Sequence, residues 1–299
     1  MAGAGVSEKV EGFRFRRLDK PEEFRQVAEV ERSIGGADGG GHAPSVPLLR
    51  AIQDNGGLAI GAFADIYLAG VCASILGWDG TTLYHYSLLT AVRPEYQNHR
   101  LGLGLKLAQR DEVLRLGLHE VRWVFDPLQS RGAHLQVRRL GARPDRYYPH
   151  YYGQLSDAAN QGLETDRMRA VWALDSPDVE RRLAAGPRPP EDDQRRWSSA
   201  AAIVETEPGE SGIRLPTAVS EPSGPLAHLE IPFDLALVRQ HEPAGLRRWR
   251  HAVRDAFRLA ADLGYVVDDF VVVAPEHERR SFYLLARAPA APGASASAT

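Results

Sequence analysis

The sequence predicts an α/β protein in which strands and helices alternate along most of the chain. Residues Leu83–Val92 form an apolar run typical of a buried strand, and Val121–Phe125 form a second one. Between them, Leu101–Leu116 has the apolar spacing of a helix and follows a basic turn that leads into Gly102 and Gly104. This order of strand, helix and strand is typical of a sheet covered by helices.

The segments before Leu83 continue the alternation. Period-two runs and helical spacing predict a strand, two helices and two further strands, at Phe13–Leu18, Pro21–Ile34, Pro47–Asp54, Leu58–Phe63 and Ile66–Ile75. Residues 1–12 are expected to be a flexible leader, and the glycine-rich run Gly35–Gly41 a loop.

After the second apolar run, Ser130 is expected to cap a helix that Gly141 ends, and Arg167–Leu174 reads as a strand. We therefore predict a first domain over residues 13–180. Residues 181–225 are rich in Pro, Gly, Ser and acidic residues, which indicates a linker or irregular excursion.

Residues 226–288 regain regular patterns and predict a smaller α/β subdomain. Its expected elements are one helix and three strands, at Leu246–Leu263, Leu226–Ile231, Tyr265–Val273 and Ser281–Arg287. Residues 289–299 are rich in Ala, Pro and Ser and are expected to be a disordered tail.

Composition excludes several classes of protein. A formal charge of −3 over 299 residues argues against a protein that binds nucleic acid through bulk electrostatics. Cys72 is the only cysteine, so an intrachain disulfide or a cysteine-rich zinc site cannot form. No apolar stretch approaches membrane-spanning length and no secretion signal is present, which makes a cytoplasmic location the expectation.

The start of the Leu101–Leu116 helix is a candidate anion site. The first turn of a helix has unpaired N–H donors and the positive end of the helix dipole. Glycine lets a phosphate group approach these donors closely. The sequence therefore predicts a phosphate-bearing ligand at the amides of five successive residues, Leu101, Gly102, Leu103, Gly104 and Leu105.

This stretch resembles the GNAT superfamily of N-acetyltransferases, whose signature is Gln/Arg-x-x-Gly-x-Gly/Ala. Two registers fit, one beginning at Gln97 with Arg100 at the first glycine position, and one beginning at His99. We prefer the first, because Tyr96-Gln-Asn, Leu105-Lys106 and Ala108-Gln109 match a subgroup of predicted GNAT acetyltransferases. The same subgroup also resembles this chain in three later segments, Trp123-Val-Phe-Asp-Pro-Leu-Gln-Ser-Arg, Leu140-Gly-Ala and Tyr151-Tyr-Gly153.

The resemblance implies a GNAT-like mixed central sheet flanked by helices. The smaller C-terminal region is then either a degenerate second GNAT-like half or a helper subdomain. It also implies a transferase that passes an acyl group directly from acetyl-CoA or another acyl-CoA, without a metal, to a small amine or amino-acid-like acceptor. The partners expected are this small molecule and no nucleic acid or membrane, and we also consider a homodimer.

The resemblance further implies where the co-substrate binds. The strand end at Thr90, Ala91 and Val92 would pair with the pantetheine arm, and the amides from Leu101 to Leu105 would hold the pyrophosphate. Gln97 and Arg100 would lie at the rim of this site. A degenerate GNAT-fold module that binds CoA or a partner without catalysis is the alternative.

Catalytic candidates are less well marked. The helix tyrosine common in GNAT enzymes falls at Val137 here, and the subgroup's asparagine falls at Gly132. Tyrosines just beyond that helix, Tyr147, Tyr151 and Tyr152, are the candidate acids, in a strand expected to run beside Val121–Phe125; aromatic packing is the alternative. His85 is the candidate base or a structural residue, and Asp126 is a catalytic or turn-capping residue.

Overall fold

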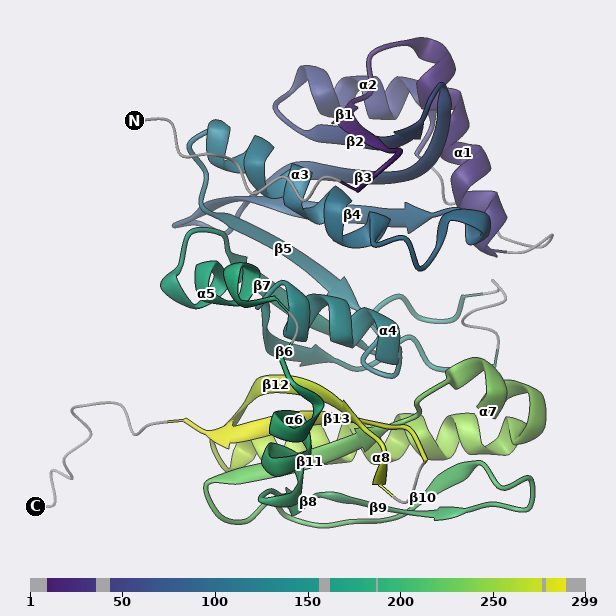
Figure 1. The fold of residues 1–299 in the computed structure, drawn as a ribbon, viewed down its shortest axis with the longest axis vertical. Helices are drawn as coiled ribbons and strands as arrows, with labels where there is room; N and C mark the ends of the chain where they lie inside the picture. The colour runs from purple at the N-terminus through teal and green to yellow at the C-terminus, as the bar shows by residue number, and fades with distance from the viewer. Residues whose placement is uncertain (1–9, 36–43, 156–161, 187, 276–277, 289–299) are drawn as a thin grey trace, which may run out of the picture. The chain divides into compact units, whose positions relative to one another are not determined.

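The computed structural model describes residues 10–35, 44–155, 162–186, 188–275 and 278–288 (Figure 1). Most of the expected leader and glycine-rich loop, and the whole expected tail at 289–299, lie outside these residues. The chain forms two compact units. The first comprises Met1–Asp126 and His134–Gly186, and the second comprises Pro127–Ala133 and Pro187–Thr299.

The first unit contains a seven-stranded mixed sheet of order β1-β2-β3-β4-β5-β7-β6. Its strands are β1 (Arg14–Arg17), β2 (Leu58–Ala64), β3 (Tyr67–Trp78), β4 (Leu83–Val92), β5 (Glu120–Phe125), β6 (Arg143–Tyr148) and β7 (Arg167–Ala173). All neighbours are antiparallel except β4 and β5, which are parallel. The predicted α/β fold with a mixed sheet flanked by helices is confirmed.

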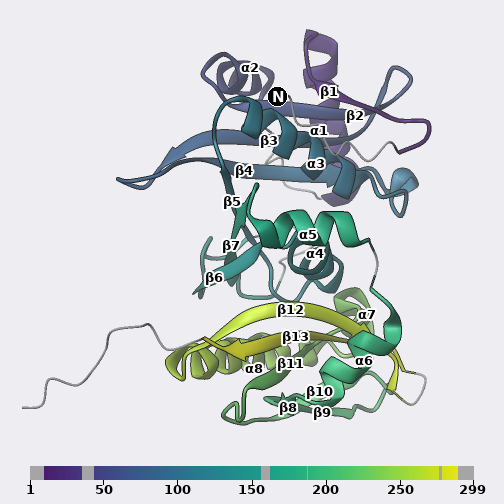
Figure 2. The ribbon, with the colours of Figure 1, turned by 60° about the vertical axis from the view of Figure 1, so that its left-hand side comes forward.

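Helices cover both faces of this sheet (Figures 1 and 2). The helices α1 (Pro21–Gly35) and α2 (Val46–Asp54) share a buried core with Ala59 and Phe63 of β2. Side chains alternate along a strand, so Ala62 and its partner Gly70 face the other side. A Cβ at Gly70 would lie 3.1 Å from Leu105, so this face is covered by α3 (Leu101–Arg115).

The helix expected from Ser130 to Gly141 is divided in the structure. A short α4 (Ser130–Ala133) is followed by a π-helical stretch, η2 (His134–Arg139). Segment 127–133, which contains α4, belongs to the second unit, where Ser130 Oγ lies 2.7 Å from Ser281 Oγ and Tyr283 donates to the Pro127 carbonyl at 3.0 Å. The first unit resumes at η2 and ends with α5 (Pro177–Ala185).

The second unit contains a four-stranded sheet of order β12-β13-β11-β8 and a two-stranded sheet. Its strands are β8 (Ala201–Ala202), β9 (Val204–Pro208), β10 (Arg214–Val219), β11 (Leu226–Ile231), β12 (Tyr265–Val273) and β13 (Arg280–Arg287), and its helices after α4 are α6 (Pro190–Ser198), α7 (Leu235–His241) and α8 (Pro243–Asp262). The strands and the long helix predicted over 226–288 are present. Here β13 lies between the parallel strands β11 and β12, whereas in the first unit β4 and β5 are direct neighbours.

Both faces of the four-stranded sheet are packed (Figure 2). Tyr283 of β13 contacts the ring of Phe257 from α8 at 5.3 Å between centroids. The next residue in the alternation, Phe282, faces the opposite side and contacts Trp197 of α6 at 5.5 Å. The second unit therefore has a hydrophobic core of its own on each side of the sheet.

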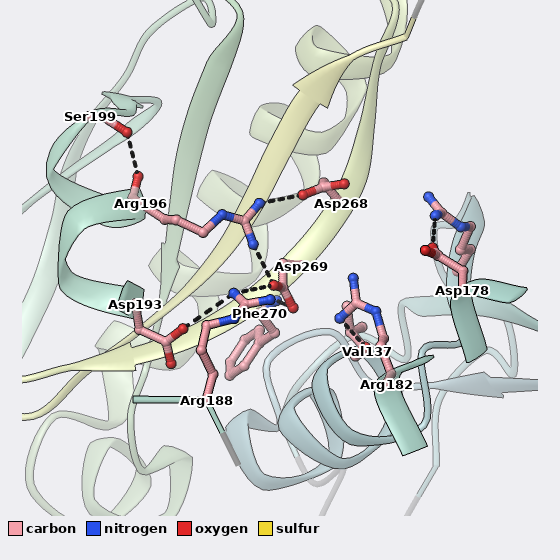
Figure 3. Close-up of polar contacts among 11 residues, drawn as sticks. Val137, Asp178, Arg182, Arg188, Asp193, Arg196, Ser199, Asp268, Asp269 and Phe270 are labelled. Carbon is pink, nitrogen blue, oxygen red and sulfur yellow. Dashed lines mark hydrogen bonds and ion pairs between the residues drawn. The ribbon is translucent and has the colours of Figure 1, made fainter. Parts of the chain in front are cut away.

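Residues 181–225, expected to be a linker or irregular excursion, contain the end of α5, the helix α6 and the strands β8 to β10. Their polar composition reflects short elements with few buried side chains. Charge pairs hold α6 in place: Arg188 and Arg196 both donate to Asp269 of β12, whose side chain is fully buried, and Arg196 also pairs with Asp268 (Figure 3).

Across the parts of the chain that the structure describes, no helix combines the length and apolar character needed to cross a bilayer.

Candidate functional site

A pocket of about 170 Å³ opens in the first unit between β4 and β5. It is lined by residues of β4, α3, β5, η2 and the turn after η2, namely Ser87, Leu88, Leu89, Thr90, Lys106, Trp123, Val124, Leu135, Gln136 and Leu140. Gln136 accepts a hydrogen bond of 2.9 Å from the Trp123 indole, which joins the π-helical wall to β5. π-Helical stretches re-aim side chains relative to an α-helix and are frequent at functional sites.

The pocket exists because β4 and β5 separate along their length. Their parallel pairing is confined to His85↔Val121 and Tyr86↔Arg122. Beyond Tyr86, the β5-facing backbone groups of β4 have no strand partner and border the pocket instead. On its other side β4 has a bulge at Leu88, because Ala73 pairs with Leu89 while Ser74 pairs with Ser87. A bulge bends its strand and interrupts the ladder of backbone hydrogen bonds.

The amino-terminal end of α3 adjoins this pocket. A Cβ at Gly102 would lie 3.5 Å from Leu135, which is one of the lining residues. No side chain caps the helix, so the backbone N–H groups of its first turn, at Leu101, Gly102 and Leu103, remain available as donors. Gln97 donates to the Val92 carbonyl at 3.2 Å and fixes the turn before the helix.

Arg100 is the N-cap residue of α3 and has a left-handed backbone, with φ 60° and ψ 14°. Only glycine adopts this conformation without steric cost. Arg100 therefore occupies a backbone position that favours glycine.

The two glycines of the helix differ in what surrounds them. An added Cβ at Gly102 would make only ordinary contact, whereas one at Gly104 would come within 2.4 Å of the Phe15 ring. Gly104 is therefore needed for close packing of α3 on β1. The side chains of Leu101, Leu103 and Leu105 are buried, so only their backbone groups are candidates for ligand contact.

Lys106 lines the pocket and is the feature that sequence reasoning missed. It is 4% exposed, and its ammonium donates to Gln109 Oε1 at 2.7 Å and to Ser87 Oγ at 3.3 Å. Its Nζ lies 4.0 Å from the centroid of the Trp123 ring, in a cation–π contact. Burial lowers the pKa of Lys106 to about 8. The sequence indicates the burial of Lys106 by its place in the apolar stretch Leu101–Leu107. This is unusual, because lysines in a helix normally face solvent.

His85 lies in the interior of the sheet and outside the residues that line the pocket. Its side chain is fully buried, and Nδ1 lies 3.0 Å from Ser74 Oγ. Burial, with a smaller effect from the charge of Arg17, lowers the pKa of His85 to about 4. The imidazole is therefore neutral at physiological pH and a weak base.

The tyrosines that follow η2 do not lie in one strand beside β5, although the sequence predicted that they would. The strand β6 ends at Tyr148, and Tyr151 and Tyr152 belong to the turn that follows. β7 lies between β5 and β6, so β6 does not run beside β5 as predicted. The reason is that β7 comes later in the chain and pairs with both strands, which local pattern cannot reveal.

Within this group Tyr147 has a carboxylate partner, whereas Tyr151 and Tyr152 contact each other. Tyr147 donates to Asp166 at 2.7 Å, which holds its hydroxyl. Tyr151 is 41% exposed and Tyr152 is 49% exposed, and their rings are in contact at 4.7 Å between centroids. Burial and the neighbouring tyrosines raise the pKa of Tyr86, which hydrogen-bonds to Tyr151. None of these tyrosines is among the residues that line the pocket.

The other candidate residues fall at the edges of the site. Thr90 lines the pocket, and Ala91 and Val92 continue β4 towards the turn that leads to α3. Asp126 follows β5 directly and is half-buried. Among the residues that the structure describes, no three His, Cys, Asp or Glu side chains are grouped so that they could hold a metal ion.

No protein-family model matches the sequence, and no curated protein sequence is significantly similar to it. Solved structures are similar to part of it. The ribosomal-protein-S18-alanine N-acetyltransferase from Escherichia coli is 16% identical over 55% of this chain and 95% of its own, with a TM-score of 0.44. An acetyltransferase of the GNAT family from Streptococcus pneumoniae is 12% identical over 53% of this chain and 98% of its own, also at 0.44.

Aminoglycoside 6'-acetyltransferase type Ii is 15% identical over 59% of this chain and 99% of its own, with a TM-score of 0.43. The structural neighbours are GNAT-family acetyltransferases. What the site can do chemically depends on the residues described above.

Proposed function

We propose that this protein is an acyl-CoA-dependent N-acyltransferase, with acetyl-CoA as the expected acyl donor and a small amine or amino-acid-like molecule as acceptor. The observation that carries the proposal is the gap between β4 and β5, which leaves backbone groups of β4 without a strand partner and adjoins the uncapped end of α3. An amide-containing arm such as pantetheine can pair with these backbone groups, and a pyrophosphate can accept from the α3 amides.

This arrangement supports direct transfer. The acceptor nitrogen must be neutral when it attacks the thioester carbonyl, and the carbonyl oxygen gains negative charge in the transition state. A backbone N–H of β4 near the bulge at Leu88 would be the donor to that oxygen, because Leu88 lines the pocket and the strand is irregular there. Thr90, Ala91, Val92, Gln97 and Arg100 remain proposed contacts for the co-substrate.

For the proton acceptor we do not favour His85, because the pKa of about 4 leaves it mostly unable to take up a proton at neutral pH. Tyr147, Tyr151, Tyr152 and Asp126 stay proposals for contacts with the acceptor or with a proton-carrying water. Phe substitution at each tyrosine removes the hydroxyl alone and measures its part in turnover.

Ligand binding tests the proposal without knowledge of the acceptor. A Cβ added at Gly102 would make only ordinary contact with Leu135. Gly102→Val should therefore keep the fold, as its melting temperature without ligand will show, while its branched side chain keeps a phosphate group from the α3 amides. Leu116→Val, at the opposite end of the same helix, is the matched control. We expect acetyl-CoA to raise the melting temperature of the parent and of the control, and to leave that of Gly102→Val unchanged. Equal shifts in all three proteins would place the ligand elsewhere.

The second candidate is a CoA-binding or interaction module without catalysis. It is favoured by Val137, a buried valine where GNAT enzymes commonly have a tyrosine. Release of free thiol from acetyl-CoA, measured with a panel of primary amines and with water alone, separates the two functions. Binding without thiol release would favour the module.

A further inference from the structure

The pocket between β4 and β5 is lined by one buried ammonium group, that of Lys106. Five of its lining residues have protic side-chain groups, namely Ser87, Thr90, Lys106, Trp123 and Gln136. Serine and threonine hydroxyls and the glutamine amide are very weak acids, and the Trp123 indole N–H is already donated to Gln136. Lys106 alone among these pocket-lining residues can hold or release a proton under ordinary conditions.

The surroundings of Lys106 do not explain it as a structural residue. It is buried to 4% exposure, and the partners of its ammonium are the neutral Gln109, the neutral Ser87 and the face of Trp123, with no carboxylate among the described residues that contact it. Burying an ammonium group without a counter-ion costs free energy, and such groups recur at functional sites. A leucine or methionine at this position would pack without that cost.

The contacts also fix the direction of the ammonium group. Gln109 lies one helical turn after Lys106 on α3 and accepts one of its three N–H bonds, while Ser87 of β4 accepts a second. Ser87 is itself within 3.8 Å of Cys72 Sγ, which accepts from Thr90 at 3.4 Å. The pocket-lining side chains of Thr90 and Ser87 are therefore linked through Cys72 of β3 in a series of polar contacts that ends at Lys106.

From this geometry we propose that Lys106 is the catalytic acid that protonates the departing CoA sulfur, a role that the tyrosine missing at Val137 cannot fill. The inference rests on the proposed N-acyltransferase function. As the acceptor nitrogen forms its bond to the acyl carbon, the carbon–sulfur bond breaks and its electron pair stays on sulfur. A proton passes from Lys106 Nζ to that sulfur, and the proton lost by the acceptor nitrogen restores the ammonium.

The test uses the full chain with Lys106→Met, which keeps an unbranched side chain of similar length and removes the acid together with the Nζ hydrogen bonds to Gln109 and Ser87. Lys20→Met, at an exposed lysine of the same unit, is the matched control. Three measurements are made on each protein: acetyl-CoA affinity by calorimetry, thiol release with primary amines and with water from about pH 6 to about pH 10, and the melting temperature. Lys106→Gln serves as a second variant if the methionine protein does not fold.

We expect Lys106→Met to bind acetyl-CoA within about threefold of the parent and to release thiol roughly 100-fold more slowly at neutral pH. The parent should lose activity as the pH rises through the pKa of Lys106, near 8, because the acid is then deprotonated, and the variant should lack this decline. The control should match the parent in all three measurements.

One result would overturn the role of Lys106 alone: a variant whose rate and pH profile match those of an active parent. A parent that binds acetyl-CoA and releases no thiol to any amine or to water would overturn the proposed transfer as well, and would favour the module without catalysis. Failure of the parent to bind acetyl-CoA at all is a different outcome, because it removes the proposed function and this inference with it.

Discussion

Replacing Lys106 with methionine should change how the stability of the protein depends on pH, because the substitution removes a buried charge. In the unfolded chain a lysine has its ordinary pKa of 10.5, whereas burial in the folded protein lowers the pKa of Lys106 to about 8. Each pH unit between these values corresponds to about 1.4 kcal/mol. The charged form therefore lowers the free energy of unfolding by about 3 kcal/mol relative to a neutral side chain in the same place.

The sign of the pH dependence follows from proton binding in the two states. Below about pH 8, Lys106 has its proton in both the folded and the unfolded protein, and the cost of burying the charge is fully present. Between about pH 8 and pH 10.5 the unfolded chain binds more protons than the folded one, so the stability of the parent rises with pH. Lys106→Met has no such group and should lack this part of the rise.

Urea denaturation of both proteins at several pH values from about 7 to about 10 measures this difference. Other titrating groups contribute equally to both proteins and cancel when the two free energies are subtracted. We expect the stability of the variant relative to the parent to fall by up to about 3 kcal/mol as the pH rises from about 7 to about 10, in addition to a constant difference from the lost Nζ hydrogen bonds to Gln109 and Ser87. A stability difference that does not change with pH would refute the account of Lys106 as an uncompensated buried charge.

Two further predictions concern single residues. Arg100→Gly should raise the free energy of unfolding by about 0.5 to 1 kcal/mol in urea denaturation, because glycine relieves the left-handed backbone at the α3 N-cap; a loss of stability would show that the arginine side chain contributes more than the strain costs. Asp269→Asn should lower the free energy of unfolding by about 2 to 3 kcal/mol, because Arg188 and Arg196 lose their buried charged partner. An Asp269→Asn variant with unchanged stability would show that these ion pairs contribute nothing to the free energy of unfolding.

Local sequence pattern predicted the elements of the protein better than their pairing. The spacing of Leu83–Val92 and of Leu101–Leu116 was sufficient to predict β4 and α3, because side-chain periodicity is a local property. The position of β7 between β5 and β6 was not predictable in the same way, since it depends on pairing between segments far apart in the chain. Local pattern also could not show that β6 ends at Tyr148, so the sequence predicted Tyr151 and Tyr152 to be in a strand.

In the candidate site, too, local features could be predicted from the sequence and features that depend on strand pairing could not. The sequence predicted a turn that leads into a helix beginning at Leu101, and the structure has this turn and this helix start. The pocket itself could not, because it results from the bulge at Leu88 and from the point where β4 and β5 cease to pair. The sequence signal for the burial of Lys106 was its place in the apolar stretch Leu101–Leu107, but its contacts could not be predicted, since they come from Trp123 and Ser87 on two other strands.

The short excursion at residues 127–133 has a consequence for how this protein can be rearranged. Residues 127–133 belong to the second unit but lie between the two segments of the first unit in the sequence. Neither unit can therefore be separated from the other by cutting the chain at a single point. A fragment that begins at Pro187 would deprive Ser281 and Tyr283, both fully buried, of their hydrogen bonds to Ser130 and Pro127, at about 1 to 3 kcal/mol for each. Recombination within this chain therefore has to carry the excursion together with the C-terminal residues that receive it.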